Sequence, residues 1–203
     1  MIKNVVFDVG QVLVTFDPPN YMRKLGYSEN VIEALMKAMF NHPLWGELDR
    51  SLHTKAELME MFVANAPEYE KEIRDVFGSI EKSAEPQPYV IEWMEELKER
   101  GVGLYVVSNY AEFMYEGTKH SMLFLPYMDG VVFSYMCHAI KPEREIFETL
   151  LNTYNLKAEE CVFIDDRAEN IEGAQKVGFT GIQFQSYAQA KEALNQYLAP
   201  MNE

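Results

Sequence analysis

Five short runs of apolar residues punctuate the chain, and they predict β-strands. Most of them are continuous runs of β-branched or aromatic residues, without alternation between apolar and polar positions. Continuous apolar runs are typical of strands that are covered on both faces, as in a parallel sheet. The strands are expected at residues 4–7, 104–107, 131–134, 161–164 and 182–184.

Helical periodicity fills the segments between the later strands. Val90, Met94 and Leu97 recur at helical spacing before the second strand. Two further helices are expected, one starting at Pro142 and one ending before Gly178. Strands that alternate with helices form βαβ units with right-handed crossovers. The sequence therefore predicts an α/β protein with a three-layer, Rossmann-like parallel sheet.

The alternation of strands and helices is interrupted once, in residues 16–87. This stretch shows helical periodicity and no convincing strand, and it follows directly after the first strand. The sequence therefore predicts a Rossmann-like core of residues 1–15 and 88–203, with an all-helical domain inserted between its two parts. The helices of this insert are expected at about residues 29–40, 54–65 and 69–80.

The composition is that of an ordinary globular protein, except for its charge. With 48% hydrophobic and 25% charged residues, the chain is neither disordered nor collagen-like nor a coiled coil. The 18 basic and 32 acidic residues leave a net charge of −14. Such a surface repels phosphate backbones and anionic lipids, so we expect no nucleic-acid partner and no membrane partner. An anionic small-molecule substrate would need a cation or a lysine at its site.

The cysteines and the apolar runs indicate the compartment. Cys137 and Cys161 form neither a CxxC motif nor a disulfide framework, which suits a reducing cytosol. The chain starts with one lysine and a very short apolar stretch, unlike a signal peptide. No apolar run approaches the ~18 residues that a membrane helix needs. We therefore expect a soluble, cytoplasmic protein, whose oligomeric state the sequence does not predict.

Polar residues stand at the carboxyl ends of the predicted strands. In an open α/β sheet, ligands bind outside these ends, so the side chains there are expected to meet at one edge. Aspartate is poorly suited to strands and is not needed to finish one. The polar residues at or just beyond the strand ends are Asp8, Ser108, Asn109, Lys141, Asp165 and Asp166.

Clustered carboxylates beside a lysine indicate phosphoryl chemistry. Mg²⁺ binds proteins through one or two carboxylates, waters and substrate phosphate oxygens. A neighbouring lysine suits a phosphoryl group, whose charge needs partners on several sides. One carboxylate can then act as a nucleophile and form an aspartyl-phosphate, which water hydrolyses. Each residue alone could equally be a helix cap, a turn residue or a surface charge, so it is their occurrence at all the strand ends that favours a site.

Four segments of the chain resemble the haloacid dehalogenase-like hydrolase superfamily, in the family's order and spacing. They are VVFDVGQVLVTFD, VVSN, IKPEREIF and VFIDDRAENIEGAQKVG, and the resemblance extends over nearly the whole chain. The helical insert occupies the position of the cap in the family's helical-cap subclass. Within the family, FDVGQVLVTFD and DDRAEN are most similar to a bacterial branch that includes an α-glucose-1-phosphate phosphatase.

The resemblance implies a nucleophile and a metal site. Asp8 would be the nucleophile that becomes phosphorylated. Asp8, the backbone carbonyl of Gly10 and the carboxylate of Asp166 would bind Mg²⁺ as the cofactor. Asp165 and Asn170 would order the waters around the ion without binding it directly.

The resemblance also implies a site for the phosphoryl group of a small phosphorylated metabolite. Ser108 and Asn109 would hold its oxygens. Lys141 would neutralise the nucleophile and the phosphoryl group together. In this family the cap chooses the substrate, and the segment HPLWGELDR at residues 42–50 lies there. Trp45 of this segment is expected either to stack on a sugar face or to be buried within the cap.

One position departs from the family pattern. Family phosphatases usually carry a second aspartate two residues after the nucleophile, as general acid and base, where this chain has Gly10. Such help is worth about 10²–10⁴-fold in rate, so slow turnover of alkyl phosphates is expected. The leaving group could be a good one, such as the anomeric hydroxyl of a sugar 1-phosphate; Asp17 could substitute; or the protein could bind phosphate without hydrolysing it. The similar branch also has glycine there, which favours the first explanation.

A metal-independent 2-haloacid dehalogenase is the chemical alternative. Those relatives also lack the second aspartate and also use an aspartate nucleophile with Ser-Asn and lysine. A metal-free site gains nothing from further negative charge, so the pair Asp165 and Asp166 favours a metal and phosphate. The sequence thus predicts a hydrolase of the phosphatase type that depends on Mg²⁺.

Overall fold

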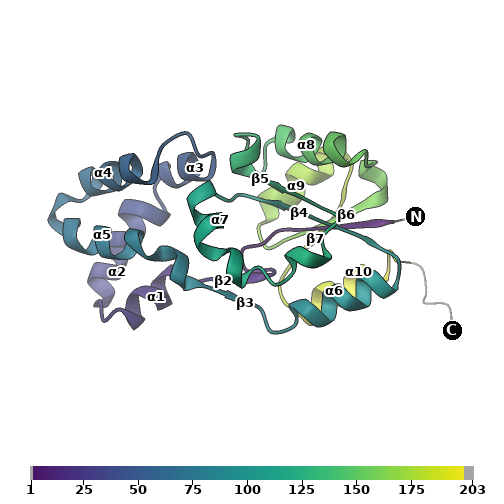
Figure 1. Cartoon of the computed structure of the whole chain (residues 1–203), viewed down its shortest axis with the longest axis horizontal. Coiled ribbons are helices and arrows are strands. Elements are labelled where there is room, and N and C mark those ends of the chain that lie inside the picture. Colours follow the sequence, from purple (N-terminus) through teal and green to yellow (C-terminus); the bar gives the residue numbers. More distant parts are fainter. Residues whose placement is uncertain (1, 199–203) are drawn as a thin grey trace.

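The computed structural model describes residues 2–198 and has a five-stranded parallel sheet at its centre (Figure 1). The strand order is β5-β4-β1-β6-β7, so the first strand lies in the middle of the sheet. Each strand predicted from the sequence is present: the first has the predicted ends, and the ends of the others differ by at most two residues. The strands are β1 (Asn4–Phe7), β4 (Gly103–Ser108), β5 (Gly130–Phe133), β6 (Cys161–Asp165) and β7 (Thr180–Gln183).

Helices cover both faces of the sheet, which confirms the predicted three layers (Figure 1). Successive residues of β1 face opposite sides: Val6 packs under α8 and α9, whereas Val5 and Phe7 pack under α6 and α10. This double burial explains why the strand sequences are continuously apolar. The covering helices are α6 (Val90–Glu99), α8 (Arg144–Tyr154), α9 (Ala168–Val177) and α10 (Tyr187–Asn195). The helix predicted to start at Pro142 thus begins two residues later.

The helical insert forms a separate group of helices beside the sheet (Figure 1). Its apolar faces make a core of their own, in which Phe62 and Phe77 are fully buried, and Met114 of α7 (Glu112–Thr118) joins this core. The predicted helical segments are present, whereas α1 and α3 were not predicted. The helices of the insert are α1 (Pro18–Lys24), α2 (Glu29–Leu35) continued by a π-helix (Met36–Phe40), α3 (Leu44–Asp49), α4 (Lys55–Asn65) and α5 (Glu70–Gly78).

Two short antiparallel strands, β2 (Val14–Phe16) and β3 (Ala84–Pro86), join the insert to the core. The prediction that residues 16–87 contain no strand is therefore wrong for β3. Two of its three side chains are exposed, so its sequence carries no apolar pattern. Backbone pairing with β2 holds this strand in place. The chain enters and leaves the insert through this pair. Short 3₁₀ turns lie at Pro67–Tyr69, Ile80–Ser83, Lys119–Ser121, Leu125–Tyr127, Ser134–Met136 and Ala158–Glu160.

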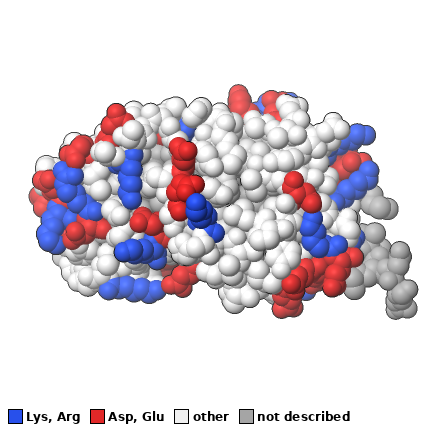
Figure 2. All heavy atoms as spheres, in the orientation of Figure 1, with Lys and Arg blue, Asp and Glu red and all other residues white. Residues whose placement is uncertain are grey.

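The surface shown in Figure 2 carries most of its charged side chains over the insert and at the opposite end, with a largely uncharged middle. Basic side chains are interleaved with acidic ones. Arg74, for example, pairs with Glu60 at 2.7 Å and with Glu70 at 2.9 Å. Such pairing leaves no broad basic patch on this face. None of the helices in residues 2–198 is both long enough and apolar enough to span a membrane.

Candidate active site

Asp8 lies at the carboxyl end of β1, the middle strand of the sheet. Its backbone N–H donates to the carbonyl of Ile164 in β6 at 2.9 Å, which extends the strand pairing to this residue. The side chain is buried, and its Oδ1 accepts hydrogen bonds of 2.7 Å from the backbone N–H of Val9 and from Ser108 Oγ at the end of β4. The backbone of the next residue and the end of β4 therefore fix one oxygen of the Asp8 carboxylate.

Lys141 is a buried cation between two carboxylates. Its Nζ lies 2.7 Å from Asp8 Oδ1 and 2.6 Å from Asp165 Oδ2. Burial alone would lower the pKa of Lys141, but the two adjacent carboxylates outweigh burial and raise it. Asn109 holds the lysine backbone, because its Oδ1 accepts from Lys141 N at 2.7 Å and its Nδ2 donates to Lys141 O at 3.2 Å. The lysine is thus charged and fixed.

Asp165 lies behind the other groups and is completely buried. Asn170, in the first turn of α9, donates through Nδ2 to both of its oxygens at 3.0 Å. The backbone N–H of Arg167 donates to Asp165 Oδ1 at 2.8 Å. Lys141 contacts the other oxygen, Oδ2, so the carboxylate of Asp165 bridges Lys141 and the start of α9. This arrangement suits a residue that positions its neighbours.

The carboxylates at this edge could hold a metal ion. One oxygen of each of Asp8, Asp165 and Asp166 lies within 4.8 Å of the others. Burial raises the pKa of Asp8 to about 6, although Lys141 opposes the effect, and Asp165 raises the pKa further. Burial and Asp165 likewise raise the pKa of Asp166. Clustered hard oxygen donors with more negative charge than one lysine can balance fit a hard divalent cation such as Mg²⁺.

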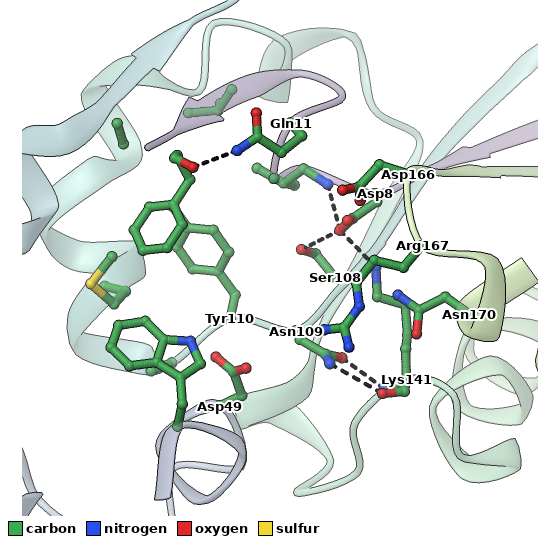
Figure 3. A pocket seen from close by; sticks show the side chains of 18 of the residues that line it. Asp8, Gln11, Asp49, Ser108, Asn109, Tyr110, Lys141, Asp166, Arg167 and Asn170 are labelled. Atoms are coloured by element: carbon green, nitrogen blue, oxygen red, sulfur yellow. Dashed lines mark hydrogen bonds and ion pairs between the residues drawn. The ribbon is translucent and has the colours of Figure 1, made fainter. Parts of the chain in front are cut away.

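A pocket of about 210 Å³ opens beside this edge, where the core faces the insert (Figure 3). The residues predicted from the sequence to form a site line this pocket, except Asp165, which lies behind Lys141. The predicted site residues among those that line the pocket are Asp8, Gly10, Ser108, Asn109, Lys141, Asp166 and Asn170. The fold therefore brings together residues that are far apart in the sequence, as the strand-end pattern predicts.

The opposite wall of the pocket is largely apolar. Phe16 of β2, Trp45 and Leu48 of α3 and Met114 of α7 line it. Trp45 is half-buried and packs on Phe40, with ring centroids 4.6 Å apart. Trp45 therefore packs against the apolar core of the insert and also lines the pocket, and its stacking on a sugar face stays a prediction.

Asp49 is a pocket residue that the sequence did not reveal. It is the last residue of α3, and its carboxylate points from the insert into the pocket (Figure 3). Burial raises its pKa to about 7; Lys141 opposes this shift and Asp8 adds to it. The segment carries no motif, but Trp45, Leu48 and Asp49 stand at helical spacing i, i+3 and i+4. Prediction of α3 would have placed these three side chains together.

Asp17, considered as a substitute for the acid missing at Gly10, lies elsewhere. It caps the N-terminus of α1, where its Oδ1 accepts from Asn20 N at 3.0 Å. Among residues 2–198, Asp17 does not line the pocket, whereas Gly10 does. A Cβ atom added to Gly10 would meet no other heavy atom within 4 Å. The glycine is therefore not required by crowding at this position.

Comparison with curated proteins finds phosphatases of similar length. The chain is 24% identical over 180 residues to the sesquiterpene phosphatase astK of Aspergillus oryzae, covering 89% of this chain and 88% of that protein. It is 23% identical over 213 residues to the D-ribitol-5-phosphate phosphatase of Bacteroides thetaiotaomicron, covering 96% and 97%.

Comparison with solved structures shows the same fold. A HAD family enzyme from Bacteroides thetaiotaomicron, in complex with magnesium and inorganic phosphate, matches with a TM-score of 0.72 and 21% identity, over 93% of this chain and 98% of that chain. The L-2-haloacid dehalogenase from Xanthobacter autotrophicus matches with a TM-score of 0.69 and 18% identity, over 99% and 86%. The model of one family, the haloacid dehalogenase-like hydrolases, matches residues 2–178. The chain therefore belongs to the haloacid dehalogenase-like hydrolases and is an enzyme of that family.

Proposed function

We propose that this hydrolase is an Mg²⁺-dependent phosphatase, which removes phosphate from a small phosphorylated metabolite through an aspartyl-phosphate on Asp8. The observation that supports this most strongly is the group formed by the buried Asp8, Lys141 and Asp165 with the partly buried Asp166 at one edge of the sheet. The phosphatases among its relatives also favour this reaction.

The hydrogen bonds of Asp8 suggest how it attacks phosphorus. Val9 N, Ser108 Oγ and Lys141 Nζ all contact Oδ1, so we assign the attack to Oδ2. The bond from phosphorus to the alcohol oxygen breaks as the new bond forms, and water then hydrolyses the aspartyl-phosphate. Ser108 lies close enough to Asp8 to meet the same phosphoryl group.

Spare donors remain for the phosphoryl oxygens. Lys141 uses two of its three ammonium hydrogens on carboxylates, and Asn109 uses one of its two amide hydrogens on the lysine backbone. The third ammonium hydrogen of Lys141 and the second amide hydrogen of Asn109 are free to donate to the substrate. Bound by Asp8, Asp166 and the carbonyl of Gly10, Mg²⁺ would offset the negative charge of the carboxylates and of the phosphoryl oxygens. Asp165 and Asn170 would support these groups from behind.

Residues 16–87 act in this proposal as a cap that selects the alcohol. Gly10 alone favours a sugar 1-phosphate, because an anomeric alcohol leaves without much protonation. The pocket wall adds a second criterion, since Phe16, Trp45 and Leu48 offer apolar and aromatic surface. Apolar lining with few polar groups selects ligands by their apolar area. We therefore favour an ester whose alcohol is small and presents an apolar face.

Phosphate release from a panel of esters tests the proposal. The panel contains sugar 1-phosphates, sugar 6-phosphates, ribitol 5-phosphate, short prenyl phosphates and p-nitrophenyl phosphate, each assayed with Mg²⁺, with EDTA and with Asp8→Asn. We expect release that requires Mg²⁺ and falls more than about 10⁴-fold in Asp8→Asn. The prenyl phosphates are expected to have the highest kcat/KM, and a preference for sugar 1-phosphates would instead favour the leaving-group explanation.

Two other functions give different results in the same assays. A metal-independent dehalogenase would release halide from 2-haloacids in the presence of EDTA. A protein that binds phosphate without hydrolysing it would bind Mg²⁺ and inorganic phosphate in calorimetry and release nothing from the esters. Either result would replace the phosphatase assignment, and the adjacent aspartates Asp165 and Asp166 make the first the less expected.

A further inference from the structure

We propose that Asp49, from the helical insert, is the general acid and base of the reaction, in place of the side chain absent at Gly10. This inference rests on the proposed phosphatase function. It assigns to the insert a catalytic residue for the leaving alcohol and for the attacking water.

The position of Asp49 fits a group that faces the alcohol. The nucleophile and the predicted metal ligands line the core side of the pocket, whereas Asp49 enters from the insert side (Figure 3). An ester with its phosphoryl group at Asp8 extends its alcohol toward the insert. Asp49 does not belong to the group of carboxylates that could hold a metal ion, which consists of Asp8, Asp165 and Asp166 in the described part of the chain. Its carboxylate is therefore available for proton transfer.

Contacts between the insert and the core hold the Asp49 backbone in place. Ser134 Oγ donates to the carbonyl of Asp49. The next residue, Arg50, donates to Glu143 Oε2 at 2.9 Å and to the carbonyl of His138 at 3.1 Å, and its own carbonyl lies 2.8 Å from His138 Nδ1. These groups fix the end of α3 against the loop that carries Lys141. The carboxylate itself has no hydrogen-bond partner within residues 2–198.

The charges around Asp49 suit a proton donor near neutral pH. Burial raises its pKa to about 7; Lys141 and Arg167 oppose the shift, and Asp8 adds to it. Tyr110, which interacts with Asp49 across the pocket, has a pKa raised to about 12 by burial and stays neutral. A general acid works best when its pKa is near the operating pH. Asp49 can therefore hold a proton before the alcohol leaves and accept one afterwards.

Asp49 donates a proton in the first step of the reaction and accepts one in the second. In the first step Asp8 Oδ2 bonds to phosphorus, the bond from phosphorus to the alcohol oxygen breaks, and protonated Asp49 gives its proton to that oxygen. In the second step water attacks phosphorus, the bond to Asp8 breaks, and the Asp49 carboxylate takes the proton of the water. The products are the alcohol and inorganic phosphate, and both aspartates return to their starting states.

Two esters with different leaving groups distinguish proton donation from a structural role. A butyl alcohol must be protonated as it leaves, whereas p-nitrophenolate is a stable anion that needs no proton. We expect Asp49→Asn to slow single-turnover phosphorylation by butyl phosphate about 10²–10⁴-fold. Phosphorylation by p-nitrophenyl phosphate is expected to change less than about threefold and to appear as a burst of one p-nitrophenolate per enzyme, because dephosphorylation has lost its base.

Gly10→Asp provides a rescue that a structural role cannot explain. Because an added side chain at Gly10 meets nothing within 4 Å, the double variant Gly10→Asp/Asp49→Asn is expected to fold and to regain at least about tenfold in rate on butyl phosphate. Glu47→Gln, which removes a carboxylate from the same helix outside the pocket lining, serves as the matched control and should match the wild type.

The outcomes separate this inference from the proposed function. Equal losses on both esters in Asp49→Asn, or no rescue by Gly10→Asp, would overturn the role of Asp49 while leaving the phosphatase function intact. An unchanged rate on butyl phosphate in Asp49→Asn would do the same. Absence of phosphate release from the unaltered protein would overturn both.

Discussion

The two walls of the pocket are built differently. On the core wall, Asp8, Lys141 and Asp165 are buried and joined by contacts of 2.6 to 2.7 Å. On the insert wall, aromatic and aliphatic side chains surround Asp49, whose carboxylate has no hydrogen-bond partner in residues 2–198. The core wall pairs its lysine directly with two carboxylates, whereas the carboxylate of Asp49 on the insert wall forms no ion pair within residues 2–198.

This difference separates the tasks of the two walls. In the proposed reaction the phosphoryl group is the same in every substrate, so the groups that would meet it can be fixed in the sheet. The alcohol varies between substrates, so the groups that meet it lie on an insert that can vary independently of the sheet. Substitutions on the core wall should therefore impair every substrate and also the fold, and those on the insert wall should act selectively.

The largest effect is expected on the core wall, from Lys141→Met. This change leaves Asp8 and Asp165 buried without their cation, which typically costs about 3–5 kcal/mol. We expect the free energy of unfolding to fall by that amount in urea titrations without added metal, and phosphate release to be lost on all esters.

Lys191→Met is the matched control for that change. Lys191 pairs with Glu96 at the surface, where such a pair contributes about 0–1 kcal/mol. If Lys141→Met were no more destabilising than Lys191→Met, the core wall would not depend on the pairing of Lys141 with Asp8 and Asp165, and the contrast between the walls would be lost.

Asp49→Asn should have the opposite sign on stability. The pKa of Asp49 is raised to about 7 in the folded protein, so the folded state holds this proton more tightly than the unfolded state does. Stability is therefore lost as pH rises from the unfolded pKa, near 4, through about 7. We expect Asp49→Asn to raise the free energy of unfolding by on the order of 2 kcal/mol at pH 8, and by much less at pH 4.

Urea titrations of both proteins at the two pH values measure this difference. Glu47→Gln on the same helix is the control and should show no such dependence on pH. An equal gain for Asp49→Asn at pH 4 and pH 8 would mean that ionisation of Asp49 does not destabilise the folded state. The contrast between the unpaired carboxylate of the insert wall and the paired charges of the core wall would then be wrong.

The unequal construction of the walls also explains what the sequence could predict. Asp8 and Asp165 end continuous apolar runs, and the two-sided burial that makes such runs also places their ends at one edge. Local sequence thus predicts the core wall. The helix α3 is six residues long and starts after Pro43 without a side-chain cap, so the spacing of Trp45 and Leu48 is a weak local signal for it. Its register depends on the burial of Leu48 in the insert core, which only the tertiary structure reveals.

A smaller and selective effect is expected from Trp45→Ala. The ring lines the pocket and packs on Phe40 and Phe16, so its removal takes away apolar surface that would cover the alcohol. Loss of such contacts is worth about 1–3 kcal/mol in discrimination. We expect the ratio of kcat/KM for prenyl phosphates to that for p-nitrophenyl phosphate to fall at least about tenfold.

Phe40→Leu is the control for this change, because Phe40 belongs to the same aromatic cluster but lies outside the pocket lining, and it should leave the ratio unchanged. An unchanged ratio in Trp45→Ala would show that the alcohol binds elsewhere.

The smallest effect on stability is expected where the two walls meet, from Arg50→Ala. Its guanidinium joins the insert to Glu143 and to the carbonyl of His138, and because the pair is partly exposed it should contribute about 1 kcal/mol or less. Its loss nevertheless loosens the backbone beside Asp49, and small displacements of a catalytic group can cost up to about 10²-fold in rate. We expect kcat on butyl phosphate to fall about tenfold with little change for phosphorylation by p-nitrophenyl phosphate.

Arg74→Ala is the control for this change. It removes an arginine that pairs within the insert alone, with Glu60 and Glu70, and should leave both rates unchanged. Equal slowing of both esters by Arg50→Ala would mean that the contact orders the core wall as well, since Glu143 lies two residues from Lys141.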